Sequence, residues 1–171
     1  MKKLVKVALM LVASISLTSC GNVAEKIVVR NYKLEGVKDL GFGSDIHFRA
    51  NLVLDAENFS RHNLELKSFE GVLYNKNGKP VANITTDCYN RCILWKMNRQ
   101  DVIIPVNFDF DNFLSTISLV AGGDLSALGA KGYTIDYVCK VRYGCVTKVI
   151  RDQAVPMSTL LRYLDRLSDL Q

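Results

Sequence analysis

Residues 46–56 read IHFRANLVLDA, and every second side chain in this stretch is apolar. Polar residues, among them His47, Arg49, Asn51 and Asp55, stand between the apolar ones. Successive side chains of a β-strand point to opposite faces of the sheet, so this alternation predicts a half-buried strand. The stretch decides the fold class, because the same period returns along the rest of the chain.

The next apolar stretch, residues 64–74 (LELKSFEGVLY), alternates and then changes phase near Ser68. A change of phase within a strand indicates a β-bulge or a bend. Asn77 and Gly78 follow, a pair that is typical of tight turns between antiparallel strands. Residues 81–84 would form the returning strand, so a hairpin is expected here.

Two further stretches alternate with the same period. Residues 102–110 contain Pro105, which cannot donate a backbone hydrogen bond, so an edge strand or a bulged strand is expected. Residues 133–141 form the second stretch, and residues 142–144 would make a three-residue turn with a left-handed glycine. Residues 146–150 would then pair with 133–141.

An early strand at residues 26–32 brings the total to about seven. The spacing of strands and turns predicts an all-β domain over 26–156, an antiparallel β-sandwich of the immunoglobulin or fibronectin-III type. A short helix at 114–120 is expected after a capping Asp111. A C-terminal amphipathic helix is expected over 157–171, since leucines recur at helical spacing there.

The N-terminus has the pattern of a processing signal. Residues 1–19 run from three lysines through an apolar segment to small and polar residues, as bacterial secretory signals do. The sequence Leu17-Thr18-Ser19-Cys20-Gly21 resembles the lipobox of bacterial lipoproteins, which implies that Cys20 carries lipid and becomes the new N-terminus. Several acyl chains hold a protein stably at a membrane. An ordinary secretory signal with a chance cysteine is the alternative reading.

Localisation and charge follow from this signal. Residues 20–25 would tether the domain to a bacterial envelope membrane, facing the periplasm. The net charge is +5 for the whole chain, but three of its 22 basic residues lie in the signal, so the mature chain carries about +2. No basic run interleaved with aromatic residues is present, and nucleic-acid binding is not expected.

The order of these elements resembles a known family. Residues 71–82 (GVLYNKNGKPVA) and 103–106 (IIPV), followed by the helix at 114–120, the tyrosine-rich strand at 133–141 and a last hairpin, resemble late embryogenesis abundant type 2 domains. These domains are also called water stress and hypersensitive response (WHy) domains. The resemblance implies a fibronectin-III-like sandwich without known catalysis, associated with stress protection or partner binding in envelopes.

Four cysteines follow Cys20, namely Cys88, Cys92, Cys139 and Cys145. An even number in an exported domain favours disulfide bonds. Closeness in sequence favours Cys88 with Cys92 and Cys139 with Cys145, although a three-residue turn leaves the second pair out of register, and cross-pairing stays open.

The residues that could carry chemistry are few. A thiol oxidoreductase using Cys88 and Cys92 is an alternative, but their spacing is not the Cys-x-x-Cys of such enzymes. His47 and His62 lie at no ligand spacing from a cysteine, so no metal is expected, and no cofactor is expected either. Hydrolase motifs such as Gly-x-Ser-x-Gly are absent from the sequence, and Asp109 is expected on the solvent face of its strand. We therefore expect a protein that is not an enzyme.

Binding surfaces are better candidates. The loop from Asp87 to Trp95 includes Tyr89 and Arg91, residue types that are enriched at binding hot spots. The competing interpretation places Trp95 in the core.

Two more surfaces remain open. The leucine stripe of the last helix would bind a partner or pack on its own domain; its members are Leu160, Leu164 and Leu167. Four basic residues of the last hairpin would face anionic lipid or protect a sheet edge; they are Lys140, Arg142, Lys148 and Arg151.

The predicted function is that of a non-catalytic envelope lipoprotein, a module that binds a partner or stabilises the envelope under stress. The alternative is an accessory subunit of an envelope transport or assembly complex, which would dock through the C-terminal helix.

Overall fold

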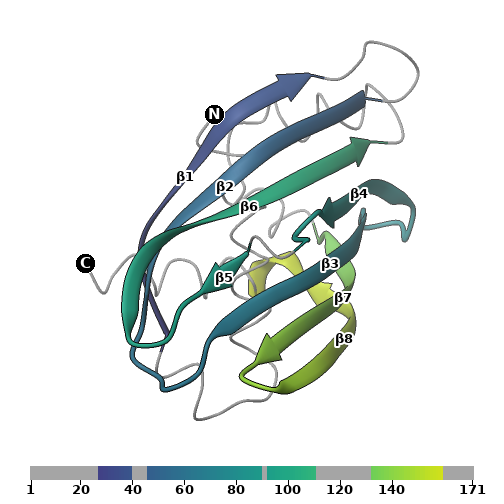
Figure 1. The fold of residues 1–171 in the computed structure, drawn as a ribbon. Helices are drawn as coiled ribbons and strands as arrows, with labels where there is room; N and C mark the ends of the chain where they lie inside the picture. Colours follow the sequence, from purple (N-terminus) through teal and green to yellow (C-terminus); the bar gives the residue numbers. More distant parts are fainter. Residues whose placement is uncertain (1–26, 40–45, 90–91, 111–131, 160–171) are drawn as a thin grey trace.

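The computed structural model describes residues 27–39, 46–89, 92–110 and 132–159. They form an antiparallel all-β fold, as the alternating pattern predicts (Figure 1). The strands are β1 (Ile27–Asp39), β2 (Ile46–Asn58), β3 (Leu64–Tyr74), β4 (Pro80–Thr86), β5 (Ile93–Leu94), β6 (Asn98–Phe110), β7 (Thr134–Tyr143) and β8 (Val146–Pro156). Residues 157–159 are helical.

The strands pair in the order β1-β2-β6-β4-β3-β7-β8, and β5 pairs with β3 beside this path. β1, β2 and β6 lie together as one group, and β3, β7 and β8 as another (Figure 1). β4 joins the groups, because it pairs with β3 and also with β6. One hydrogen-bonded path therefore runs through both groups, and the immunoglobulin or fibronectin-III sandwich stays a prediction.

The core lies where the two strand groups meet. Its largest fully buried side chains come from five different strands, and they include Phe69, Phe108, Leu52, Ile84 and Ile135. Full burial of such a side chain stabilises the fold by roughly 1.5–3 kcal/mol relative to exposure. The alternating residues of β2, β6 and β7 are buried as predicted, so the period-2 pattern correctly identifies the core face.

A glycine in β3 makes room for this core. A Cβ atom at Gly71 would lie 3.0 Å from the ring of Phe69 and 3.1 Å from Ile135. The Phe69 ring stacks on Tyr137, with ring centroids 5.8 Å apart. Gly71 thus allows a close approach between side chains of adjacent strands.

Two local predictions in β3 are confirmed. The register between β3 and β7 shifts between Leu66 and Ser68, where the change of phase predicts a bulge. Gly78 has a positive φ of 72° in the turn between β3 and β4. Glycine adopts this left-handed conformation without steric cost.

The prediction of an edge strand or a bulged strand at Pro105 is wrong, because β6 lies between β2 and β4 and pairs with β2 without a register shift. The ladder between β4 and β6 stops at Val106, the residue next to the proline. The carbonyl of Pro105 accepts a hydrogen bond from the backbone N of Asp87 at 3.3 Å. The backbone nitrogen and carbonyl of a strand residue point to the same neighbouring strand. The nitrogen of Pro105, which carries no hydrogen, therefore faces β4 at the point where the pairing of β4 with β6 ends.

The turn between β7 and β8 also differs from the prediction. Tyr143 pairs with Val146, so the connection consists of Gly144 and Cys145 and not of residues 142–144. Gly144 has the expected left-handed conformation, with φ 61°.

Several predictions lie outside the described residues. They concern the signal at 1–19, Cys20 with its tether, the helix at 114–120, and the leucine stripe with Leu160, Leu164 and Leu167. Only the start of the last segment is described, and there Met157 is fully buried and its backbone N donates to the carbonyl of Tyr133 at 3.0 Å.

Candidate functional site

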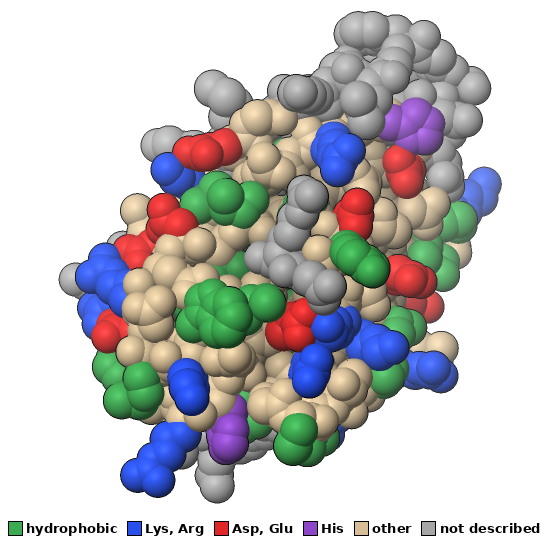
Figure 2. Space-filling view, in the orientation of Figure 1, with side chains coloured by type: hydrophobic (Ala, Val, Ile, Leu, Met, Phe, Trp, Pro, Cys, Tyr) green, Lys and Arg blue, Asp and Glu red, His purple; other side chains and the backbone are tan. Residues whose placement is uncertain are grey.

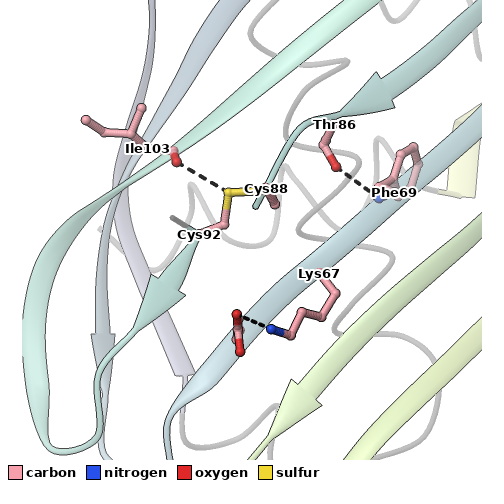
Figure 3. Close-up of a disulfide and its surroundings, with 7 residues drawn as sticks. Lys67, Phe69, Thr86, Cys88, Cys92 and Ile103 are labelled. Carbon is pink, nitrogen blue, oxygen red and sulfur yellow. Dashed lines mark hydrogen bonds and ion pairs between the residues drawn. A yellow bond between two sulfur atoms is a disulfide. The ribbon is translucent and has the colours of Figure 1, made fainter. Parts of the chain in front are cut away.

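A disulfide closes an interruption between two short strands. β4 and β5 both pair with β3. The chain therefore leaves β3 after Thr86 and returns to it at Ile93. Cys88 and Cys92 are bridged at the base of this excursion, as predicted, with their Cα atoms 5.3 Å apart (Figure 3). Both cysteines are buried, at 1% and 2% exposure. In the chain-entropy description, closing so short a loop contributes about 2 kcal/mol.

The bridge is fixed to the strands on both sides. The backbone N of Leu66 in β3 donates to the carbonyl of Cys92 at 3.0 Å. On the other side, Sγ of Cys92 lies 3.5 Å from the carbonyl oxygen of Ile103 in β6 (Figure 3). Tyr89, inside the closed loop, is 83% exposed. The loop therefore presents Tyr89 to solvent from a covalently closed base, while Arg91 lies outside the described residues.

Trp95 is exposed, and the interpretation that places it in the core is wrong. Its exposure is 51%, because it lies just after β5, in the turn that leads to β6. The side-chain oxygen of Gln100 accepts a hydrogen bond from the backbone N of Trp95 at 3.4 Å, and Nε2 of Gln100 donates to the carbonyl of Ile93 at 2.8 Å. The glutamine thus holds the turn that displays the indole.

Three connections meet at one end of the sheet, which we name the loop end. They are residues 59–63 between β2 and β3, residues 95–97 between β5 and β6, and residues 144–145 between β7 and β8, all at the bottom of Figure 1. The side-chain oxygen of Asn63 accepts a hydrogen bond from the backbone N of Lys96 at 2.9 Å, and its carbonyl accepts one from Gly144. These bonds join all three connections.

Asn58 lies beneath the loop end with its side chain fully buried. Its Nδ2 donates to the carbonyls of His62 at 2.9 Å and Leu94 at 3.3 Å. Its Oδ1 accepts from the backbone N of Ser60 at 2.9 Å and from the Ser60 hydroxyl at 2.6 Å. The amide uses its full capacity of two donors and two accepted bonds, so it ties the loop end together from below.

The loop end exposes apolar and basic side chains together. Phe59 is 49% exposed and Met97 68%, in addition to Trp95. Val146, the first residue of β8 next to the loop end, is 63% exposed. The basic residues of the three connections are Arg61 and Lys96, both exposed, and no acidic residue occurs in residues 59–63, 95–97 and 144–145. Figure 2 shows hydrophobic, basic and histidine side chains side by side along its lower edge.

The predicted disulfide between Cys139 and Cys145 is wrong. Cys139 is fully buried in β7 and pairs with Ile150, whereas Cys145 is exposed in the turn. The two-residue turn leaves Cys145 outside the strand pairing, so the side chains have no common register. Burial raises the pKa of the Cys139 thiol to about 12. The bridged, buried Cys88 and Cys92 have the environment of a structural disulfide and not of an exposed reactive thiol.

Charged side chains pair across the outer face of β1, β2 and β6. Arg99 donates to Asp55 at 2.6 Å, and this hydrogen bond lowers the pKa of the Asp55 carboxyl. Nδ1 of His47 lies 2.6 Å from Asp109, which confirms the expected exposed position of that aspartate. Within the described ranges no three His, Cys, Asp or Glu side chains gather as a metal site. Exposed pairs of this kind stabilise a fold only weakly.

The four basic residues of the last hairpin do not form one cluster. Lys140 pairs with Val149 and Arg142 with Thr147, which places both bases on the outer face of β7 and β8. Lys148 pairs with the buried Val141 and is therefore on the opposite face. Arg151, which pairs with Val138, shares the outer face.

Comparison with known proteins defines no family for this chain. No family model and no curated protein matches it. A protein from Archaeoglobus fulgidus of known crystal structure is similar at 9% identity and a TM-score of 0.42, over 72% of this chain and 90% of that protein. A structural-genomics target is similar at 8% identity and a TM-score of 0.37, over 75% of this chain and 83% of the target.

A beta-glucuronidase of glycoside hydrolase family 2 matches at 8% identity and a TM-score of 0.31, and only 12% of that enzyme is covered. Scores this low carry no conclusion about function. As for membrane spans, none of the helical segments that the structure describes is long and apolar enough to cross a bilayer.

Proposed function

We propose that this protein is a non-catalytic lipoprotein of the bacterial envelope, anchored through Cys20, whose β-domain binds a partner protein through the disulfide loop. The lipobox resemblance supports the anchor, and the resemblance to WHy domains supports a binding or stress-protective role. A fibronectin-III-like sandwich is part of the proposal, supported by the single core shared between the two strand groups.

The observation that carries the binding role is the presentation of Tyr89. A tyrosine that is 83% exposed forms few contacts with its own domain, so the fold gains little from it. The loop is closed by the bridge between Cys88 and Cys92. A closed loop loses less conformational entropy on binding than an open one, and tyrosine is enriched at binding hot spots. The exposure and type of Tyr89 and the covalent closure of the loop thus favour a protein contact here.

In-cell photo-crosslinking tests the binding role. A photo-reactive amino acid replaces Tyr89 in the full-length protein, and the matched control places the same amino acid at Asn77, exposed in the turn between β3 and β4. One discrete crosslinked protein at position 89, absent at position 77, is expected. No product at 89, or the same products at both positions, would overturn the proposal.

The anchor has a separate test. Cys20→Ala removes the sulfur that lipidation requires, so we expect the variant to leave the membrane fraction after a salt wash while the unmodified protein stays. A variant that stays with the membranes would contradict the anchor.

A further inference from the structure

The first described strand begins at the loop end. Ile27, the first residue of β1, pairs with Asn58, and Asn58 also pairs with Asn98 at the start of β6. Cys20 precedes Ile27 by seven residues, which span at most about 25 Å when fully extended. A lipid on Cys20 therefore keeps the start of β1 within about 25 Å of the bilayer. The other end of a 13-residue strand such as β2, which is roughly 43 Å long, can lie beyond that reach.

The side chains at this end suit a membrane interface. Tryptophan lies preferentially where the lipid headgroups meet the hydrocarbon, because its ring is apolar and its N–H is polar. Other apolar side chains, such as phenylalanine, can insert at the same boundary. Phe59, Trp95 and Met97 are three exposed apolar side chains from two neighbouring connections. Arg61 and Lys96 stand within the same connections and attract anionic headgroups.

The loop end is also organised before any contact is made. The backbone N of Met97 donates to the carbonyl of Ser60 at 3.1 Å, which joins the connection that carries Phe59 to the one that carries Trp95. The buried amide of Asn58 bonds to Ser60 in the first of these connections and to Leu94, the last residue of β5 before the second. The apolar side chains are therefore displayed together without an ordering step on binding.

We propose that the loop end contacts an anionic lipid bilayer and inserts Phe59, Trp95 and Met97 at the interface; this inference rests on the proposed anchor at Cys20. The domain then stands with its strands rising from the membrane and with the turn between β3 and β4 pointing away. Tyr89 lies between β4 and β5, outside the loop end, and stays accessible to a partner.

Trp95 is the only tryptophan of the chain, so its fluorescence reports on this end alone. The full-length protein is purified with its lipid, confirmed by mass spectrometry, and reconstituted into vesicles of phosphatidylcholine with or without phosphatidylglycerol. In the anionic vesicles we expect a blue-shifted emission and quenching by brominated lipid of at least threefold. The control variant, Trp95→Phe with Asn77→Trp, moves the indole to the distant turn, where no quenching is expected.

Charge reversal tests the lipid specificity. Arg61→Glu with Lys96→Glu is expected to remove most of the quenching in anionic vesicles. Lys76→Glu with Lys79→Glu, in the turn between β3 and β4, is the matched control and is expected to leave it unchanged.

The outcomes separate the two proposals. An unmodified Cys20 overturns the anchor and this inference with it, whereas lipidated protein with an unquenched Trp95 overturns the membrane contact alone. Equal quenching in vesicles with and without phosphatidylglycerol overturns the role of anionic lipid. The same conclusion follows if Arg61→Glu with Lys96→Glu is quenched as strongly as the control variant Lys76→Glu with Lys79→Glu.

Discussion

The turn between β3 and β4 and the loop end are built in opposite ways. In the turn, Asn75 makes every bond locally: its Oδ1 accepts from the backbone N of Asn77 at 2.9 Å and of Lys79 at 3.1 Å, and its backbone N donates to the carbonyl of Lys79. In the loop end, Asn58 bonds to Leu94, 36 residues away. Asn75 therefore shapes one turn through local bonds, whereas Asn58 joins segments that are far apart in the sequence.

Asn58→Leu should break the loop end and has the largest expected effect. The substitution removes the donor to the carbonyl of Leu94 and the acceptor of the Ser60 backbone N, and unsatisfied buried groups are costly. The Ser60 hydroxyl keeps its bond to the carbonyl of His62. We expect the free energy of unfolding to fall by about 3 kcal/mol. Urea denaturation of the full chain measures it, and a loss below about 0.5 kcal/mol would show that Asn58 does not hold the loop end.

The contrast explains which parts of the fold could be predicted from the sequence. Alternation identifies the strands and their buried faces, and the Asn77-Gly78 turn is predicted because its bonds are local. The exposure of Trp95 depends on bonds from Asn63 and Gln100, which no short pattern reveals. Nor does the sequence show that Pro105 falls where the β4 ladder stops, since strand order is a property of the whole sheet.

The cysteines and the loop end also show that contacts set by the whole sheet cannot be predicted from short sequence patterns. Cys88 and Cys92 are four residues apart and lie on the two sides of the same strand interruption, so closeness in sequence gives the right pair. Cys139 and Cys145 are also close in sequence, but the turn length separates them. The loop end itself was not predicted as a site, and the signal that could have found it is Phe59, Trp95 and Met97 beside basic residues in polar connections.

A pH experiment sharpens the comparison within one hairpin, between Cys145 in the loop end and Cys139 inside the sheet. Burial raises the pKa of Cys139 from 9.0 to about 12, so the unfolded chain ionises first as the pH rises. The contribution of the protonated Cys139 thiol to the free energy of unfolding is fully present below pH 9 and is lost progressively as the pH rises towards 12. At a pH of about 10.5 the wild type should lose about 2 kcal/mol more, relative to pH 7, than Cys139→Val.

Cys145→Val is the control for that experiment, since the side chain is exposed. It should retain the alkaline loss of the wild type. If Cys139→Val also retains that loss, the buried thiol is not its source.

Gly78 and Gly144, two turn glycines with a left-handed backbone, allow the two ends of the sheet to be compared by the same substitution. Alanine at Gly78 meets no atom within 4 Å, so Gly78→Ala carries only the backbone cost, about 1 kcal/mol. At Gly144 the new Cβ would lie 3.1 Å from the His62 ring, which packs against Tyr143. We expect Gly144→Ala to cost about 2 kcal/mol. Thermal or urea unfolding of both variants measures the difference, and equal costs would mean that His62 moves freely.

The smallest expected effect lies in the self-contained turn. Asn75→Ala removes the acceptor for two backbone N–H groups, but the turn is exposed and water replaces the lost bonds, so we expect a loss of about 0.5–1 kcal/mol. Asn75→Asp keeps an acceptor at this position and should remain close to the wild type. Because the bonds that Asn75 makes within the described part of the chain stay inside the turn, hydrogen exchange should accelerate only at Asn77, Gly78 and Lys79. In Asn58→Leu it should accelerate across all three connections of the loop end. Faster exchange at Lys96 or Gly144 in Asn75→Ala would contradict the separation between a local turn and a long-range assembly.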